Sequence, residues 1–509
     1  MAQASSEAVS VRPELQAVRD AQHALLDVAR PQAVEFQRKR GRWTVREVLA
    51  ALIDPHTFVE YGGLARPAVK EMAGPADGMV MGTARVEGRA TDVVLYDYSV
   101  YAGTQSVINH LKLTRMLEHA LRWRYPVVMW LDGGGARTQD LLLPARSKAT
   151  CFTVFGQLSG LVQTVGVVPG NAFAGHANLA GMCDMLIGLR GSALGMGGPP
   201  LVESALGVKL RPTDIGPAEM HEKSGVYDLV VEDDGAAIET ARRYLAYFGP
   251  PRTPGPEQDQ AVLRDIVPDN PRQAYDVRRV IEILADVDSV MELRPVFGAC
   301  IVTALVRIAG RTVGVVANQP TQMAGAIDSD GSTKAARFVS VCDAFDIPLL
   351  VLCDTPGLMV GPEAEATGLV RHSARLMTAI VNATVPMMTV VLRKAYGLGH
   401  YVMGSASLDP AILLAWPTAE YGGMGLEGAV NILHRRALEA ISDLDARNAK
   451  RAELTAEMKE EHKAIVAAGR LVYDDVIDPA DTREILRRTL DGFPVAEPRS
   501  VRKRIIEPF

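Results

Sequence analysis

The stretch Val86-Glu87-Gly88-Arg89 returns later in the chain as Ile308-Ala309-Gly310-Arg311, at an offset of 222 in the numbering. The same offset recurs at Ala102-Gly103 and Ala324-Gly325, at Lys112 and Lys334, at Asp132 and Asp354, and at Gly175 and Gly397. Chance matches scatter over many offsets, whereas this one holds over about ninety positions, as expected for an internal duplication. The sequence therefore predicts two homologous domains, whose related pockets can hold the two halves of one reaction.

Length and composition agree with two domains. The chain has 509 residues, more than a single hydrophobic core usually supports. We place the domains at residues 1–255 and 256–509, because the linker Gly249-Pro250-Pro251-Arg252-Thr253-Pro254-Gly255-Pro256 holds too much proline for a helix or a central strand. Hydrophobic residues make up 48% of the chain and charged residues 22%, and the net charge is −6. Neither a nucleic acid nor a membrane is therefore expected as a partner.

Cysteine usage bears on the compartment and on metals. The five cysteines are an odd number and lack paired CxxC spacing. This pattern argues against a disulfide framework and against a zinc ribbon. We therefore expect a protein of the reducing cytoplasm, with no metal site.

Local patterns in each half predict a strand, a helix and a second strand. The ranges are Val93–Tyr96, His110–Leu121 and Val127–Leu131 in the first half, and Thr312–Ala317, Ser332–Phe345 and Leu349–Leu352 in the second. Units of this kind are typical of an α/β fold with right-handed crossovers. The section from Leu15 to Ile53 is predicted to be helical. The charged segment from Arg435 to Ala468, which has no counterpart in the first half, is predicted to form a solvated helical pair.

Glycine gathers in two loops of each half, directly after apolar strands. These loops are Asp132–Arg137 and Phe173–His176 in the first half, and Asp354–Leu358 and Tyr396–His400 in the second. Glycine and alanine let backbone N–H groups approach a ligand closely, and two such donors aimed at one point stabilise a developing oxyanion. The same pattern also suits glycines that only turn tight corners. No loop carries the phosphate-binding GxxxxGK[ST] motif, so the sequence does not support nucleotide hydrolysis.

At these loops the chain resembles the carboxyltransferase (beta) subunits of biotin-dependent acyl-CoA carboxylases, of the propionyl-CoA carboxylase beta type. Further stretches that carry the resemblance are His221–Asp228, Val315–Pro320, Lys334–Val339, Val402–Ser405, Leu414–Ala419 and Gly428–Leu433. The resemblance implies two tandem crotonase-like domains of the ClpP/crotonase spiral type, related by duplication. By this resemblance the first domain binds acyl-CoA and the second binds carboxybiotin.

The resemblance also implies a reaction and its residues. Carboxybiotin would give CO₂ and the biotin enolate, which removes the α-proton of the acyl-CoA, and the acyl enolate would attack CO₂. Ala174 and Gly175 would hold the thioester oxyanion, and Leu398 and Gly399 the biotin oxyanion. The implied substrate-binding residues are Gly134, Gly135, Ala136, Arg137, Pro356, Gly357 and Tyr401.

Biotin and coenzyme A are the groups that this reaction needs. The chain lacks a biotinyl-lysine motif of the Ala-Met-Lys-Met kind, so biotin would be carried by a partner protein, and coenzyme A would arrive as part of the substrate. The expected partners are a biotin carboxylase, a biotin carrier subunit and further copies of this chain, usually in a hexamer.

The chain departs from the pattern of that family at two places. Leu398-Gly399 stands where the family has Gly-Ala, and Tyr401 stands where the propionyl-CoA type has aspartate, which argues against assigning propionyl-CoA as the substrate. One alternative is a biotin-independent acyl-CoA decarboxylase or related enolate enzyme, in which His176 and His400 serve as acid or base. A noncatalytic assembly subunit is the other alternative. The sequence leaves open the acyl group and the direction of transfer.

Overall fold

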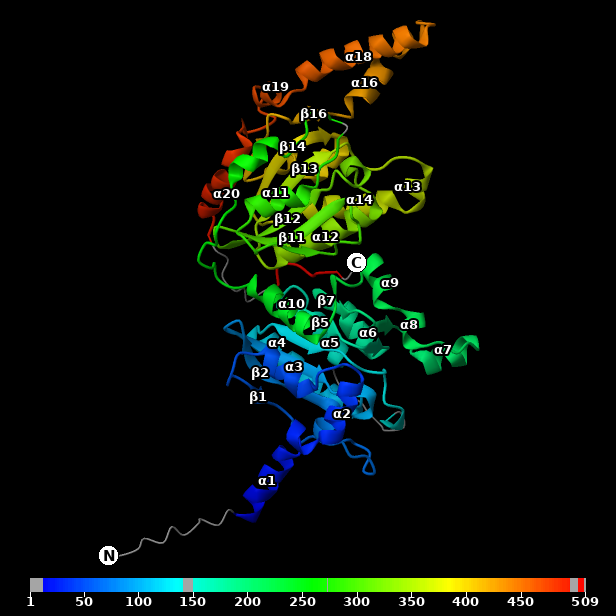
Figure 1. Cartoon of the computed structure of the whole chain (residues 1–509), viewed down its shortest axis with the longest axis vertical. Helices are drawn as coiled ribbons and strands as arrows, with labels where there is room; N and C mark the ends of the chain where they lie inside the picture. The colour runs from blue at the N-terminus through cyan, green and yellow to red at the C-terminus, as the bar shows by residue number, and fades with distance from the viewer. Residues whose placement is uncertain (1–11, 141–149, 272, 495–501, 508–509) are drawn as a thin grey trace, which may run out of the picture. The chain divides into compact units, whose positions relative to one another are not determined.

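The computed structural model describes residues 12–140, 150–271, 273–494 and 502–507 (Figure 1). The chain divides into two compact units. The first unit comprises residues 1–221 and 230–245, and the second comprises residues 222–229 and 246–509. The domain boundary between residues 255 and 256 stays a prediction of the sequence.

The first unit is built on a seven-stranded sheet of order β1-β2-β3-β4-β5-β7-β9. Its strands are β1 (Val59–Glu60), β2 (Met79–Val86), β3 (Arg89–Tyr96), β4 (Val127–Trp130), β5 (Thr164–Val168), β7 (Met185–Leu189) and β9 (Leu229–Val231). A second, two-stranded sheet joins β6 (Asn171–Phe173) to β8 (Ala193–Gly195). The helices around these sheets include α3 (Val45–Leu52), α4 (Val107–Trp123), α5 (Cys151–Leu158), α6 (Gly175–Gly181) and α10 (Asp234–Ala246).

The second unit repeats this plan with the order β10-β11-β12-β13-β14-β15-β17, and β16 pairs with β14. Its strands are β10 (Met291–Leu293), β11 (Ile301–Ile308), β12 (Arg311–Asn318), β13 (Leu349–Thr355), β14 (Met387–Tyr396), β15 (Ile412–Ala415), β16 (Glu420–Gly422) and β17 (Asp475–Val476). Its helices include α11 (Val277–Leu284), α12 (Ser329–Ala344), α14 (Leu369–Val381), α15 (Gly397–Val402) and α20 (Thr482–Asp491).

The duplication is confirmed down to the register of the strands. The offset of 222 relates both ends of β2 to those of β11, and both ends of β3 to those of β12. In both units these two strands are antiparallel, and the next strands along the sheet are parallel. In the first hairpin turn, φ is 51° at Glu87 and 75° at Gly88. In the second, φ is 50° at Ala309 and 80° at Gly310. This left-handed conformation at both positions is the one that two-residue hairpins require.

A second offset extends the repeat towards the N-terminal side of each hairpin. An offset of 232 relates both ends of α3 to those of α11. The first unit therefore has ten more residues than the second between this helix and the hairpin. The fixed offset of 222 hides this correspondence in the sequence.

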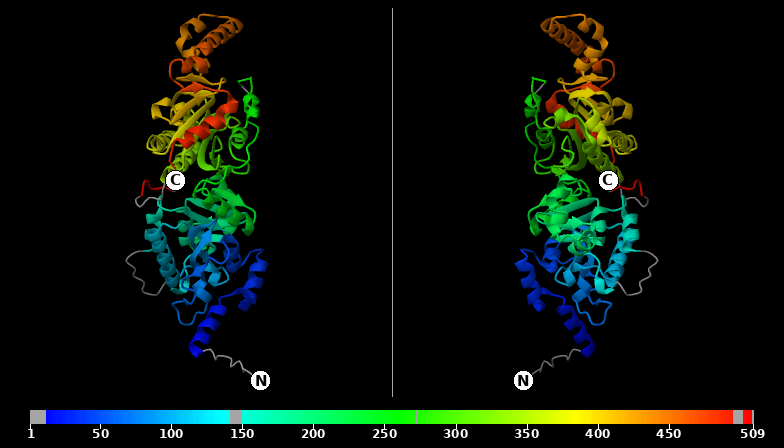
Figure 2. Two further views of the ribbon diagram at one scale, coloured as in Figure 1. Left: turned by 90° about the vertical axis from the view of Figure 1, so that its left-hand side faces the viewer. Right: turned by 90° about the vertical axis from the view of Figure 1, so that its right-hand side faces the viewer.

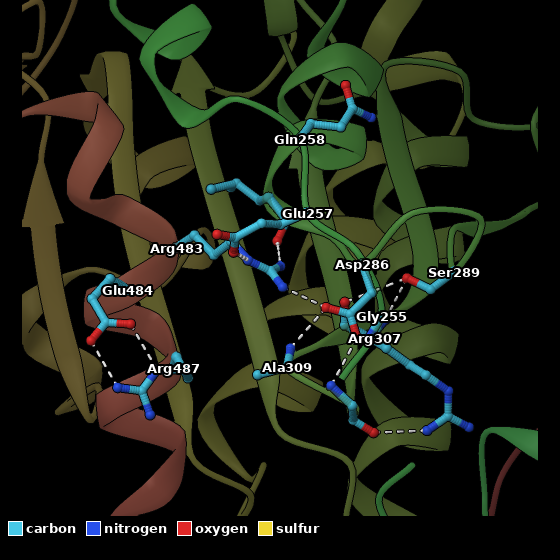
Figure 3. Close-up of polar contacts among 12 residues, drawn as sticks. Gly255, Glu257, Gln258, Asp286, Ser289, Arg307, Ala309, Arg483, Glu484 and Arg487 are labelled. Atoms are coloured by element: carbon cyan, nitrogen blue, oxygen red, sulfur yellow. Dashed lines mark hydrogen bonds and ion pairs between the residues drawn. The ribbon is translucent and has the colours of Figure 1, made fainter. Parts of the chain in front are cut away.

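In each unit an arginine of the last helix binds the carbonyl at the end of an earlier helix and the aspartate two residues after it. We call this arrangement the arginine clamp. In the second unit, Arg483 of α20 donates to the carbonyl of Leu284 and lies 2.5 Å from Asp286 Oδ1 (Figure 3). Asp286 in turn accepts the N–H of Gly310 in the hairpin turn at 2.8 Å, and Glu257 binds Arg483 Nε at 2.8 Å. The clamp thus joins the first helix, the hairpin and the last helix of the unit.

The first unit has the same clamp, more exposed to solvent. Arg242 of α10 donates to the carbonyl of Leu52 at 2.7 Å and lies 3.3 Å from Asp54 Oδ1. The second oxygen of Asp54 accepts the N–H of Gly88 at 2.8 Å. The clamp therefore belongs to the duplicated plan.

Both segments predicted as helical contain helices, and the first one is divided by a proline. The section from Leu15 to Ile53 forms α1 (Pro13–His23), α2 (Pro31–Lys39) and α3, because Pro31 can begin a helix but not continue one. The segment from Arg435 to Ala468 is helical as predicted, with α17 (Arg435–Glu439), α18 (Leu444–Glu461) and α19 (Ala464–Ala468). No side chain of α18 is buried, and it packs against α16 (Leu426–Leu433) beyond the edge of the sheet (Figures 1 and 2).

Two features are absent from the described residues. None of the helices there is both long enough and apolar enough to cross a bilayer. In the same part of the chain, no group of three or more histidine, cysteine, aspartate or glutamate side chains is placed to hold a metal ion.

Candidate active site

The first glycine loop follows β4 and is fixed by backbone hydrogen bonds on both sides. These bonds are Gly133 N to Asn171 O (2.6 Å), Gly134 N to Ala102 O (3.1 Å), Gln105 N to Gly135 O (2.8 Å) and Arg137 N to Gln105 O (2.7 Å). Gly135 has φ of 97°, and a Cβ atom built on it would lie 3.5 Å from the Cβ of Ala174. The loop therefore lies beside the first turn of α6, as the sequence predicts for two loops that share a ligand.

The two residues of the predicted donor pair at the start of α6 differ in whether their N–H groups are already bonded. Ala174 has φ of 52° and ψ of −117°, and its N–H donates to the carbonyl of Gly195 at 3.1 Å. The N–H of Gly175 has no acceptor among the described residues, nor do those of Gly135 and Ala136. Gly175, rather than Ala174, therefore has an N–H that is free to bind a ligand.

The side chain of Arg137 is buried inside the first unit. Its guanidinium lies 2.5 Å from Asp77 Oδ1 and donates to the carbonyl of Thr104 at 3.2 Å. Both charged side chains of the pair are essentially inaccessible to solvent. The sequence predicted Arg137 as a substrate-binding residue, whereas its side chain anchors the loop, because burying one charge requires the other beside it. Asp77 has no motif around it, and sequence reasoning missed it.

The two histidines that follow the glycine loops are buried and neutral. Burial lowers the pKa of His176 to about 3, with a smaller contribution from the nearby His110, and its ring lies edge-on to Tyr96 at 4.4 Å. Burial lowers the pKa of His400 to about 4, and its Nδ1 lies 3.8 Å from Cys353 Sγ. Among the described residues, neither ring nitrogen of His176 has a hydrogen-bond partner. A histidine with so low a pKa is a poor general base near neutral pH.

The second glycine loop follows β13 and repeats two of the bonds of the first. Ile327 N donates to Gly357 O at 3.1 Å, and Met359 N donates to Ile327 O at 2.9 Å, each at the offset of 222 from its counterpart. Gly357 has φ of 131°, and a Cβ atom at Gly399 would lie only 2.6 Å from the Cα of Gly357. Only glycine fits at residue 399, so the loop and the start of α15 are in direct contact.

The remaining predicted residues lie around this contact. Leu398 and Gly399 are the second and third residues of α15, and among the described residues nothing accepts their N–H groups. The side chain of Leu398 is 59% exposed, so it points away from the core of the unit. Pro356 is exposed and Tyr401 is half-buried. Within the repeat, Leu398 corresponds to His176, so the second predicted donor pair lies two residues further into the first turn of its helix than the first pair does.

The backbone of Ala174 provides a prediction about stability. A side chain is unfavourable at φ of 52° and ψ of −117°, so Ala174→Gly should raise the free energy of unfolding of the first unit by about 1 kcal/mol. Ala177→Gly, in the helical part of α6, should lower it by about 1 kcal/mol. Denaturant unfolding followed by hydrogen exchange in β6 measures both variants. A loss of stability in Ala174→Gly would contradict the strain.

Comparisons with known proteins show what the chain is similar to. Residues 36–499 match the family model described as the carboxyl transferase domain. The methylmalonyl-CoA carboxyltransferase 12S subunit of Propionibacterium freudenreichii subsp. shermanii is 36% identical over 474 residues, which cover 90% of each chain.

Two solved structures are similar over most of the chain. One is a single-chain, multi-domain long-chain acyl-CoA carboxylase, with a TM-score of 0.88 and 40% identity. The match covers 94% of this chain, which spans about half (49%) of that protein. The other is the transcarboxylase 12S hexamer with methylmalonyl-CoA and methylmalonic acid bound, with a TM-score of 0.86, 32% identity, and coverage of 99% of this chain and 100% of that one.

Proposed function

Because this chain belongs to the carboxyl transferase family, we propose that it is the carboxyltransferase component of a biotin-dependent acyl-CoA carboxylase. The sequence predicted the family, the enzyme class and the fold of two tandem crotonase-like domains, and the matches confirm all three. In the proposed reaction a carboxyl group passes from carboxybiotin to the α-carbon of an acyl-CoA. Carboxybiotin supplies both the CO₂ and the base that removes the α-proton.

The observation that carries this proposal is the duplicated loop with free backbone donors. In the first unit, the N–H groups of Gly175, Gly135 and Ala136 would hold the thioester oxygen as it becomes an oxyanion, and Gly134, bonded to Ala102, would shape the loop. Preorganised N–H donors of this kind stabilise such charge strongly, because they need no reorganisation during the reaction. A base on the protein is not needed in this scheme, and the two buried, neutral histidines agree with that.

The second unit would hold biotin. The N–H groups of Leu398 and Gly399 suit a ureido oxygen that gains negative charge, and Pro356, Gly357 and Tyr401 would line the pocket. The residues present fit the group, since both donors have no acceptor among the described residues. Leu398 would narrow this pocket relative to the Gly-Ala pair of the family, because its exposed side chain stands beside the donors.

Partners are part of the proposal. Biotin would be carried by a separate carrier subunit and carboxylated by a biotin carboxylase. The chain spans about half of the single-chain acyl-CoA carboxylase that it resembles. We also propose that the chain assembles into a hexamer, as the transcarboxylase 12S protein does.

The proposal predicts that the reaction depends on biotin. Purified protein, tested with a series of carboxylated acyl-CoA thioesters of increasing chain length, should transfer the carboxyl group of at least one of them to a biotinylated carrier peptide. Without biotin, loss of CO₂ should be about a hundredfold slower or more, since a positioned proton-transfer group contributes at least that factor. Release of ¹⁴CO₂ and carboxylation of the peptide measure the two rates. Equal rates with and without biotin would instead favour the biotin-independent decarboxylase.

A further inference from the structure

One hydrogen bond of the duplicated loops is made differently in the two units. In the first unit the N–H of Gly134 donates to the carbonyl of Ala102 at 3.1 Å. The residue 222 positions after Gly134 is Pro356, which has no N–H to donate. The counterpart carbonyl, that of Ala324, therefore receives its hydrogen bond from another donor.

Lys394 supplies that donor from the neighbouring strand β14. Its Nζ lies 2.8 Å from the carbonyl oxygen of Ala324. The residue 222 positions before Lys394 is Ala172, whose methyl side chain cannot donate a hydrogen bond. The donor is therefore a backbone N–H in the first unit and a lysine side chain in the second, whereas the acceptor is the equivalent carbonyl in both.

The turn that receives this bond is strained in both units. Tyr101 and Ala102 have φ of 52° and 50°, and Met323 and Ala324 have φ of 48° and 54°. Residues with a side chain adopt this left-handed region only at a cost, so surrounding contacts must hold them there. The next residue, Gly325, is pressed against the glycine loop, since a Cβ atom on it would lie 2.2 Å from the carbonyl oxygen of Asp354.

Lys394 also contacts the other side of the loop. Its Nζ lies 3.5 Å from Asp354 Oδ1, and its backbone N–H donates to the same oxygen at 3.2 Å. Arg393 holds the second oxygen of Asp354 at 3.0 Å. The lysine thereby ties the strained turn to the loop, two residues before Tyr396 leads into α15 with its donors.

We propose that Lys394 is a positioning residue, which replaces the N–H missing at Pro356 and holds the turn Met323–Gly325 against the loop Asp354–Gly357 beside Leu398 and Gly399. Its effect on turnover rests on the function proposed above, whereas its effect on the turn does not. Lys394 touches no reacting atom in this assignment.

Replacing the lysine tests the assignment in the full-length protein. Lys394→Met should speed hydrogen exchange in the peptide that spans Met323–Ile327 by about tenfold, because the carbonyl of Ala324 loses its donor. Turnover with a biotinylated carrier should fall by about tenfold or more, while the KM for acyl-CoA stays unchanged. Lys394→Arg keeps a cationic donor and should retain most of the protection.

A second-site change provides the decisive control. Adding Pro356→Gly to Lys394→Met restores a backbone N–H at the position where Gly134 has one, so protection should return, and turnover should return to that of Pro356→Gly alone. Pro356→Gly alone should leave hydrogen exchange in this peptide unchanged, because Lys394 still donates to Ala324, and the turnover of this single variant is the reference for the double variant. If Lys394→Met fails to fold, folding of the double variant supports the assignment, and failure of both overturns it.

Two further results would also overturn the assignment. One is unchanged exchange in Lys394→Met, and the other is a loss that Pro356→Gly does not restore. A last outcome separates the two proposals. If hydrogen exchange responds as expected, but neither the natural protein nor any variant transfers a carboxyl group to biotin, then the proposed function is wrong and the role of Lys394 in the turn is retained.

Discussion

Replacing Arg483 by methionine should lower the free energy of unfolding of the second unit by about 3 to 5 kcal/mol. The change leaves Asp286, whose side chain is 3% exposed, without its cation in the interior of the unit. The carbonyl of Leu284 also loses its donor. Denaturant unfolding, with hydrogen exchange in the hairpin of β11 and β12 as a local probe, measures the loss.

Two variants separate the clamp from a general effect of lost charge. Arg487→Met, on the same helix, removes an exposed arginine that pairs with Glu484 and Asp491, and it should change stability little. Adding Asp286→Asn to Arg483→Met removes the stranded charge and should recover part of the loss. If Arg483→Met and Arg487→Met were equally mild, the clamp would not stabilise the unit.

Replacing Gly175 by proline should reduce turnover by about a hundredfold or more relative to alanine at the same place, because proline removes the N–H assigned to the thioester oxyanion. Gly175 is the first residue of α6, a position that accepts proline in a helix. Both substitutions bring the same Cβ atom, which would lie 2.1 Å from Gln105 Oε1 and displace that flexible side chain. The difference between them therefore isolates the donor.

The proline and alanine variants need a second substitution at residue 174. The residue before proline is restricted, so both variants are best made together with Ala174→Gly, which relaxes that residue. Steady-state kinetics with acyl-CoA and a biotinylated carrier measure turnover, and circular dichroism checks the fold. Equal turnover in the folded proline and alanine variants would exclude Gly175 as a donor.

The repeat shows how much of the fold the sequence can predict. Apolar runs at one spacing were enough to predict strands that correspond to β3, β4, β12 and β13, because such runs depend on local sequence. The strands that pair with them in the hairpins, β2 and β11, were not predicted. The correspondence of α3 with α11 was missed, because ten extra residues change the offset there, although both helices share the pattern Val-Arg-x-Val-x-x-x-Leu. The three helices between Leu15 and Ile53 merged into one prediction, although Pro31 marks a boundary between them.

Side-chain partners at the site were harder to predict than the loops. The loops were found because glycine clusters are visible in a single sequence. The burial of Arg137 depends on Asp77, which lies 60 residues away and belongs to no motif. The role of Lys394 became visible only when its bond to Ala324 could be compared with the bond of Gly134. Contacts of this kind depend on the tertiary fold, which local patterns do not encode.

The arginine clamp also has a consequence for the order in which the chain folds during translation. Its arginine donates to a carbonyl 190 residues earlier in the first unit and 199 residues earlier in the second. Neither clamp can form until the ribosome has released almost all of its unit, and contacts so distant in sequence form slowly. The first clamp closes while the second unit is still being translated, so a slowing of elongation after Ala246 would allow the first unit to fold before its homologous strands appear. Such a delay would protect the nascent chain from pairing strands of one half with those of the other.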